Sequence, residues 1–344
     1  MTRPALLDRC RRLPPACFAP VMATGAVSRA LAQSGARTTS ALLLGLAVAA
    51  YVTLLAATVL KALRHRDALR AELRDPARLF GHFTFVAASG VLATRLAHGL
   101  TRGAAYALLC VAAVVWTALA AAAVALTRSD GRAMLRYADG TWFLATVGLQ
   151  ALVLTVVGLR PGRAVITAAL ALWATAVLMY AVTLASVVLR MLRDPPEAAH
   201  LAPTYWITMG AAAISTLAGA QLATSERLSP RPARVPLDTA VTVLWSWATV
   251  VIVPLLAAGV WRHLYHRVPL PHDITLWCVV FPLGMYTTAT AQLATARGTT
   301  ALTAMERPLV YIAAVAWLAV GARFLTAPHE RARRDGPPGA RVDP

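Results

Sequence analysis

Long apolar runs, separated by short segments that carry arginine, proline and glycine, make up most of the chain. Most runs contain roughly 18 to 25 residues, the length that an α-helix needs to cross ~30 Å of hydrocarbon at about 1.5 Å per residue. We therefore predict an all-α integral membrane protein with ten transmembrane helices. Their ranges are 16–33, 41–60, 79–97, 104–126, 141–159, 164–189, 203–224, 237–261, 275–293 and 309–325.

The two ends of the chain fall outside these runs. Residues 1–13 form a basic N-terminal segment, and residues 14–325 hold the ten-helix domain. The tail at 326–344 is rich in Arg, Pro and Gly and is expected to be disordered, because it has too few apolar residues to pack. A signal peptide is the competing interpretation of the first run, since Ala30-Leu31-Ala32 fits a cleavage site. Arg29 within that run favours a membrane span instead.

Two kinds of helix alternate along the chain. The even-numbered runs are almost continuous Ala, Leu and Val, which is typical of helices that face lipid. The odd-numbered runs contain small and polar residues, which in a bilayer face other helices or a cavity. These residues are Thr24, Gly25, Ser28, Arg29, His82, Ser89, Gly90, Thr146, Gly148, Gln150, Thr208, Gly210, Ser215, Pro282, Gly284 and Gln292.

A weak internal repeat follows the odd-numbered helices. An aromatic residue precedes a glycine by seven positions in three of them: Phe18 and Gly25, Phe83 and Gly90, and Trp277 and Gly284. Each repeat holds two spans and returns the chain to the same side of the membrane, so successive repeats are parallel. The predicted fold is five parallel helical hairpins, with the odd-numbered helices around a central pore.

Composition agrees with a membrane protein, because 58% of the residues are hydrophobic, 14% are charged and the mean hydropathy is +0.61. The net charge of +18 does not indicate nucleic-acid binding, since the basic residues lie between apolar runs. Lys61 is the only lysine, which we interpret as coding bias rather than as a functional choice. The four cysteines form no close pair and predict neither disulfides nor a metal site.

The distribution of basic residues predicts the orientation. With both termini in the cytoplasm, 22 of the 33 basic residues lie inside, ten lie outside, and Arg29 remains within the first span. Because cytoplasmic loops of membrane proteins carry an excess of Lys and Arg, this orientation is favoured.

Three segments carry a resemblance to a known family: PPACFAPVMATGAVS in the first span, YWITMGAAAISTLAG in the seventh and WCVVFPLG in the ninth. Over residues 14–325 the chain resembles the tellurite-resistance and C4-dicarboxylate transporter family, which includes the plant guard-cell slow anion channels and yeast-type malate and sulfite transporters. The resemblance implies small-anion transport in the inner (plasma) membrane by a homotrimer in which each subunit has its own pore.

The resemblance also implies a phenylalanine gate on the ninth helix. By motif match the gate is Phe281, and Pro282 sets the bend that aims its ring into the pore. The residues expected to line the pore are Thr24, Gly25, Arg29, Gly90, Gly148, Gly210 and Gly284. Arg29 departs from the family pattern of an uncharged pore.

Arginines recur at the outer ends of the odd-numbered helices, namely Arg29, Arg95, Arg160, Arg227 and Arg297. Converging on one axis, they would form a positive mouth that concentrates anions. The alternative is that each complements its helix dipole and reaches the lipid headgroups. Arg29 and Arg95 lie deeper than the others, which favours a role in anion contact for these two.

Acidic residues are missing from the middle of every predicted span, so a proton relay would depend on His82. A packing role for His82 is the simpler interpretation, and passive permeation is therefore favoured over a proton-coupled dicarboxylate or sulfite carrier. We expect no catalytic residue, metal or cofactor, because His263, His266 and His272 cluster in a loop rather than at membrane depth. A non-conducting receptor or scaffold remains the other alternative.

Overall fold

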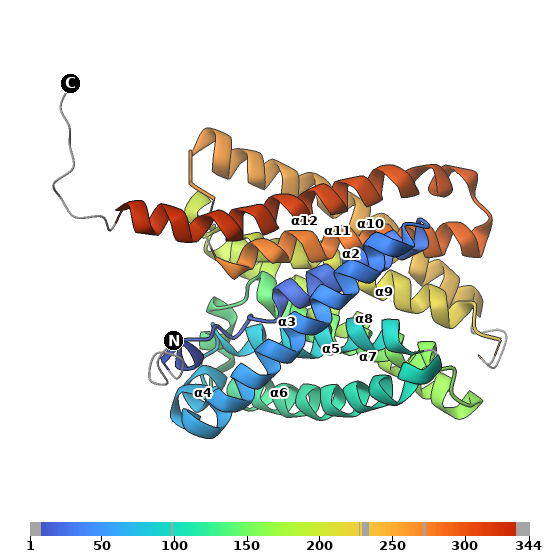
Figure 1. Ribbon diagram of the computed structural model, residues 1–344, viewed down its shortest axis with the longest axis horizontal. Coiled ribbons are helices and arrows are strands. Elements are labelled where there is room, and N and C mark those ends of the chain that lie inside the picture. The colour runs from blue at the N-terminus through green and yellow to red at the C-terminus, as the bar shows by residue number, and fades with distance from the viewer. Residues whose placement is uncertain (1–7, 98, 227, 229–233, 271–272, 335–344) are drawn as a thin grey trace.

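The protein is a bundle of long helices (Figure 1). The computed structural model describes residues 8–97, 99–226, 228, 234–270 and 273–334. The long helices are α2 (Ala19–Gln33), α3 (Arg37–Arg64), α5 (Phe83–Leu96), α6 (Arg102–Arg136), α7 (Phe143–Gly158), α8 (Arg163–Arg193), α9 (Ile207–Ala223), α10 (Arg234–Val260), α11 (Trp277–Arg297) and α12 (Thr300–Arg334). Each predicted apolar run falls on one of them, and no strand occurs in the described ranges, so the all-α prediction is confirmed there.

Nine segments of the described chain are long and apolar enough to cross a membrane. The remaining long helix, α2, has 15 residues and is shorter than each of these nine segments, of which the shortest has 18. The helix α12 continues beyond its predicted span to Arg334, and residues 335–344 of the predicted disordered tail lie outside the described residues.

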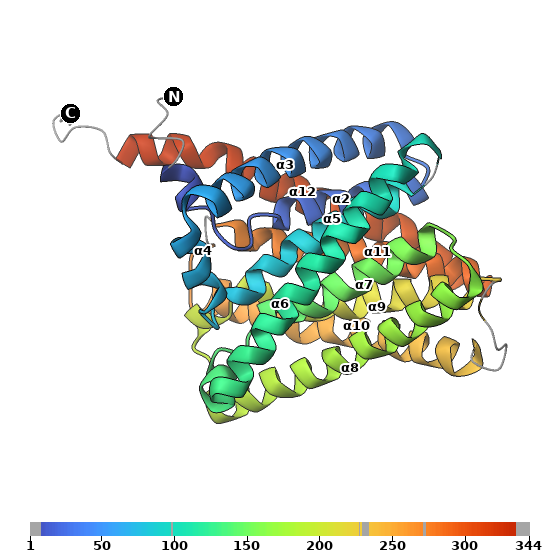
Figure 2. The same ribbon diagram turned by 90° about the horizontal axis from the view of Figure 1, so that it is seen from below.

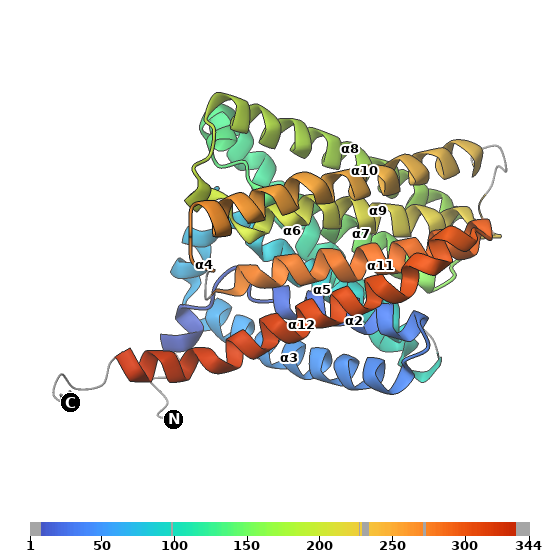
Figure 3. The ribbon, with the colours of Figure 1, turned by 90° about the horizontal axis from the view of Figure 1, so that it is seen from above.

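The helices form two layers. In α5, α7, α9 and α11 between 72% and 83% of the most apolar stretch is buried, against 11% to 28% in α3, α6, α8, α10 and α12. The inner helices contact one another in a closed ring, in the order α2, α5, α7, α9, α11 and back to α2. Figure 2 shows α6 and α8 outside α5, α7 and α9, and Figure 3 shows α12 outside α11 and α2. Burial thus follows the alternation predicted from the sequence.

Glycines mark the closest approaches between the inner helices. A Cβ atom added at these positions would lie between 2.6 and 3.0 Å from the neighbouring helix, closer than packed atoms allow. The glycines and their nearest neighbours are Gly25 with Val91, Gly90 with Ala151, Gly210 with Pro282 and Gly284 with Ala26. Four of the five contacts in the ring therefore have a glycine at the point of close approach.

A short 3₁₀ turn precedes four inner helices: η1 (Leu79–His82), η3 (Gly140–Trp142), η5 (Pro203–Trp206) and η8 (Ile274–Leu276). Aspartate side chains cap two of them, because Asp139 and Asp273 accept hydrogen bonds from the backbone N–H of Thr141 at 2.9 Å and of Thr275 at 2.7 Å. Burial raises the pKa of Asp139. These four inner helices therefore begin in the same way, after a 3₁₀ turn, which agrees with the repeat in their sequences.

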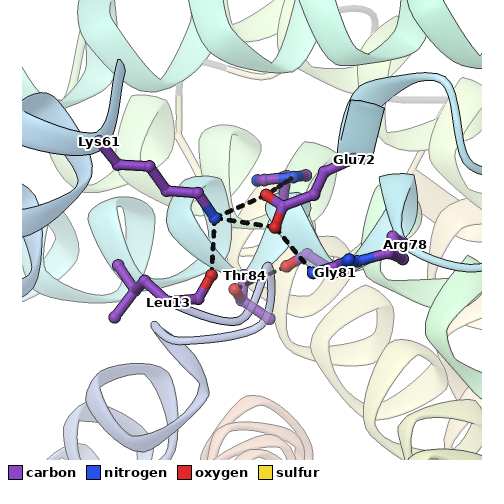
Figure 4. A network of polar contacts seen from close by, with 7 residues as sticks. Leu13, Lys61, Glu72, Arg78, Gly81 and Thr84 are labelled. Carbon is purple, nitrogen blue, oxygen red and sulfur yellow. Dashed lines mark hydrogen bonds and ion pairs between the residues drawn. The ribbon is translucent and has the colours of Figure 1, made fainter. Parts of the chain in front are cut away.

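An ion cluster, formed by the buried pair Lys61 and Glu72 with the half-exposed Arg78 and with His82 beside it, holds one end of the bundle together (Figure 4). Glu72 lies on the short helix α4 (Arg66–Leu73), and Lys61 lies near the end of α3. The Lys61 ammonium donates to both Glu72 carboxylate oxygens at 2.8 Å and to the Leu13 carbonyl at 2.7 Å. The cluster therefore ties the N-terminal segment to α3, α4 and the start of α5.

This role corrects our interpretation of Lys61 as coding bias. Its side chain is 3% exposed and that of Glu72 is 5% exposed, so both charges are out of solvent. The flexible ammonium reaches three acceptors at once, which places a specific requirement on this position.

Candidate functional site

A cavity of about 520 Å³ opens at the end of the bundle opposite the ion cluster, and we call it the vestibule. Every inner helix contributes to its wall near the helix C-terminus. Its lining residues are Arg29, Thr94, Leu154, Val157, Gly158, Arg160, Gln221, Thr224, Ser225, Glu226 and Gln292. Such a lining combines hydroxyl, amide and guanidinium groups with the carboxylate of Glu226 in one concave surface, which suits a small polar ligand.

Two smaller cavities adjoin the vestibule. One, of about 10 Å³, lies deeper and is lined by Arg29, Gly90, Val91, Thr94, Ala151, Leu154 and Met285. The other, of about 280 Å³, is lined by Arg29, Ala32, Gln33, Thr94 and Arg95, and we call it the arginine cavity. Arg29 and Thr94 line all three, so they stand where the three spaces meet.

The helix α11 carries the predicted gate on the face that lines these cavities. Met285 and Gln292 both line them and are two helical turns apart, so they share a face. Phe281 comes one turn before Met285 on the same face, about 6 Å further from the vestibule at 1.5 Å per residue. Its side chain is fully buried, and Pro282 packs against Gly210 of α9.

Arg29 has no hydrogen-bond or ion-pair partner among the described residues. Arg95 has one, because its Nη2 donates to the Ser40 hydroxyl at 2.9 Å, while its buried Nε has none. The two like charges lie close enough to affect each other electrostatically, and no carboxylate of the described chain pairs with either. This leaves a positive potential at the junction of the cavities.

The other predicted arginines are distributed differently. Arg160 lines the vestibule, as expected for a positive mouth. Arg297 is exposed and donates to the Asp238 carbonyl at 3.2 Å and to the Thr242 hydroxyl, both on α10. Arg227 lies outside the described residues. Arg29 therefore shares the vestibule with Arg160 and the arginine cavity with Arg95, and none of the three cavities is lined by all three arginines.

The remaining predicted pore residues lie mainly at contacts between helices. The hydroxyl of Thr24 accepts a hydrogen bond at 2.9 Å from the Trp317 ring of the outer helix α12. Gly148 faces Trp116 of α6, and a Cβ there would lie 3.1 Å from that ring. Of the five predicted glycines, Gly90 also lines the deeper cavity.

The histidines singled out from the sequence lie away from the vestibule. His82 belongs to the ion cluster, where its Nε2 is 3.6 Å from a Glu72 oxygen. In the π-helical turn η7 (Trp261–Tyr265) that follows α10, the His263 Nδ1 is 2.7 Å from the Val268 carbonyl. The His266 ring packs edge-on against Trp261. His272 lies outside the described residues. Within the described ranges no group of three His, Cys, Asp or Glu side chains could hold a metal ion.

Sequence reasoning missed several lining residues, notably Thr94, Gln221 and Met285. A signal was available for two of them. Thr94 comes one helical turn after Gly90, and Met285 comes one residue after Gly284. Gln221 offered only the weaker signal of an amide near the end of an apolar run.

An all-α bundle with apolar helices on the outside and an arginine-lined cavity within defines a membrane protein suited to anions. The chain belongs to the SLAC1 family of voltage-dependent anion channels, which it matches over residues 12–325. It is also similar to two uncharacterized membrane proteins of Mycobacterium tuberculosis, MT1776 of strain CDC 1551 / Oshkosh and Rv1735c of strain H37Rv. Identity to each is 44% over 104 residues, which cover 29% of this chain and 51% of theirs. The chain thus spans about half the length of these curated relatives.

Proposed function

We propose that the protein transports small anions, inorganic anions or C4-dicarboxylates, along the axis of its inner helical ring. The observation that carries this proposal is Arg29, an unpaired cation in a cavity to which all five inner helices contribute. A fixed positive charge in a low-dielectric wall attracts anions and repels cations. Membership of an anion-channel family supports the same charge selectivity.

We further propose that the protein lies in the plasma membrane, where its ten long helices cross as five parallel hairpins. Both termini would then face the cytoplasm. Packing of α2 on α3, α5 on α6, α7 on α8, α9 on α10 and α11 on α12 supports the hairpins. The excess of basic residues at the end with the ion cluster supports the orientation. A homotrimer with one pore per subunit follows from the resemblance alone.

The proposed closure is an apolar layer at the level of Phe281. We count four residues from the N-cap of α2, Phe18, and from the first residue of each other inner helix: Phe83, Phe143, Ile207 and Trp277. The count gives Met22, Ala87, Val147, Ala211 and Phe281, all fully buried. The same count one turn later gives Ala26, Val91, Ala151, Ser215 and Met285. Three of these five, Val91, Ala151 and Met285, line the deeper cavity, which supports the register.

Two alanines in this layer leave space that a large ring can fill. Ala87 and Ala211 are the smallest members, and Phe281 is the largest. An anion would have to lose its water to pass an apolar constriction, which is costly without compensating donors. Removal of the Phe281 ring would open this constriction.

The test is the anion conductance of purified protein in planar bilayers, with chloride, nitrate and malate as the permeating ions. Phe281→Ala is expected to raise the conductance at least about tenfold, which corresponds to lowering the barrier by ~1.4 kcal/mol. The matched control is Phe324→Ala, which removes the same ring from the outer helix α12, where the side chain is 36% exposed. It should conduct as the wild type does.

Silence of both wild type and Phe281→Ala would reject the gated pore. Malate uptake into liposomes under a pH gradient, in the absence of such current, would instead establish the proton-coupled carrier. Failure of every anion to cross in both assays would favour a receptor or scaffold.

A further inference from the structure

The arginine cavity, between the ends of α2 and α5, holds the two cations Arg29 and Arg95. We propose that this pair is a binding site for planar oxyanions, carboxylate or nitrate, and that it selects them over halide ions before they enter the pore. The inference rests on the proposed function, because it assigns a substrate class to the same vestibule.

The electrostatics of the described residues call for a counter-ion. Arg29 has no partner, Arg95 is bonded only to a neutral hydroxyl, and both border one cavity of about 280 Å³. Like charges that border one cavity repel each other, and no carboxylate of the described chain forms an ion pair with Arg29 or Arg95. An anion between the two guanidinium groups would convert this repulsion into two attractions.

The position of Arg95 is fixed by a second pair of side chains. Its Nη2 donates to the Ser40 hydroxyl at 2.9 Å, and that hydroxyl donates to the Ser28 carbonyl at 2.6 Å. The Ser28 hydroxyl in turn donates to the Ser40 carbonyl at 2.8 Å, and both serines are fully buried. Ser28 and Ser40 are thus positioning residues, which hold one nitrogen of Arg95 and leave its Nε unbonded.

The chemistry of the guanidinium group favours an oxyanion. Its parallel N–H groups match two oxygens of a carboxylate or nitrate, so that one group makes two charge-assisted hydrogen bonds. A halide ion offers a single centre and cannot use this geometry. A site built from two guanidinium groups therefore discriminates by shape as well as by charge.

The vestibule gives the rest of such a ligand a polar environment. Arg29 lines both the arginine cavity and the vestibule, where the side chains of Gln221 and Gln292 also lie. Neither amide has a side-chain partner in the described part of the protein. A carboxylate held at Arg29 would leave the remainder of its molecule within reach of these donors.

The experiment measures acetate and nitrate binding to the full chain in nanodiscs at constant ionic strength, by saturation-transfer NMR for acetate and by competition for nitrate and chloride. Arg29→Gln and Arg95→Gln are each expected to weaken acetate binding at least about tenfold, as for a lost charge-assisted contact. Arg29→Lys keeps the positive charge but loses the parallel N–H groups of the guanidinium. This variant should therefore bind chloride and acetate with similar affinity.

The matched control is Arg37→Gln, which removes an exposed positive charge at the same end of the bundle and should leave binding unchanged. Arg29 makes no bond in the fold, so Arg29→Gln is expected to keep the wild-type melting temperature even if Arg95→Gln does not. Unchanged acetate affinity in Arg29→Gln, or equal competition by chloride in the wild type, would overturn the proposal.

The binding result is independent of conduction. Suppose that oxyanion binding depends on Arg29 but neither the wild type nor Phe281→Ala passes current. This result would reject the proposed pore and support the proposed oxyanion site. If Phe281→Ala conducts but replacement of Arg29 or Arg95 leaves acetate binding unchanged, the oxyanion site would be rejected and the pore supported.

Discussion

At the scale of single residues, the buried pair of Lys61 and Glu72 carries the clearest energetic consequence. Removing one member of a buried ion pair leaves the other charge uncompensated, which typically costs about 3–5 kcal/mol. Glu72→Gln should therefore strongly destabilise the protein, since Lys61 would retain only neutral acceptors such as the Leu13 carbonyl. The measurement is the unfolding free energy, or the melting temperature, of the purified protein in detergent.

The same short helix supplies the control. Asp67 and Arg70 form an exposed pair at 3.4 Å, with side chains 99% and 65% exposed. Because exposed pairs contribute roughly 0–1 kcal/mol, Asp67→Asn should have little effect. A double replacement of Lys61 and Glu72 by methionine should be less harmful than Glu72→Gln alone. Equal stability of Glu72→Gln and Asp67→Asn would contradict the role assigned to the cluster.

How far single residues could be predicted depended on how unusual each was in its surroundings. Arg29 stood out, because a charge within an apolar run is costly and needs a reason. Lys61 stood out only as the single lysine of the sequence, and Glu72 did not stand out, because the two become partners only when α4 folds back on α3. Met285 is an ordinary apolar residue in sequence, and only the register of α11 places it at a cavity.

At the scale of helices, the glycines determine how closely the inner ring can pack. Gly90 lies against α7, where a new Cβ would be 2.6 Å from the Ala151 Cβ and 3.0 Å from its backbone. Backbone cannot move aside as a flexible side chain can, so Gly90→Ala should destabilise the fold by about 1–3 kcal/mol through overpacking. Thermal unfolding in detergent measures this change.

Gly45→Ala is the matched control for this substitution. Gly45 lies on the outer helix α3, and a Cβ there would have no neighbour within 4 Å. Alanine is the better helix former by roughly 0.8–1.0 kcal/mol, so Gly45→Ala should be neutral or stabilising. If both variants melted at the same temperature, close helix approach would not be the reason for glycine at position 90.

The helices themselves were predictable because their lengths and apolar surfaces are properties of local sequence. Alternation of polar and apolar runs also indicated which helices are interior, since polar residues avoid lipid. The role of the glycines was harder to predict, because a glycine in a membrane helix can either line a pore or permit a close contact between two helices. Only the neighbours of Gly25, Gly210 and Gly284 on adjacent helices reveal the close contacts.

At the scale of the whole molecule, the function depends on which end faces outward. The short helix α4, which carries Glu72, and the C-terminal end of α12 lie at one end of the bundle (Figure 1). The vestibule is lined by residues near the C-terminal ends of the inner helices, which lie at the other end. Basic residues are concentrated at the first end, so the positive-inside rule predicts that it faces the cytoplasm. The arginine-lined vestibule would then collect anions from outside the cell.

Cysteine labelling tests this orientation. In a variant without the four native cysteines, Gly162→Cys and Ala77→Cys place single thiols at exposed positions at the vestibule end and the cluster end. A membrane-impermeant maleimide added to intact cells should label Gly162→Cys and should label Ala77→Cys only after permeabilisation. Position 162 tolerates the change, since a Cβ there meets nothing within 4 Å.

The reverse labelling pattern would have a specific consequence for transport. Arg29 and Arg95 would then face the cytoplasm, where they would concentrate anions for export, and the closed layer at Phe281 would stand nearer the outer surface. The same geometry would thus support release of cellular anions rather than their capture from outside. Labelling therefore decides the direction in which the fixed charge of the vestibule favours anion entry, independently of whether Phe281 closes the path.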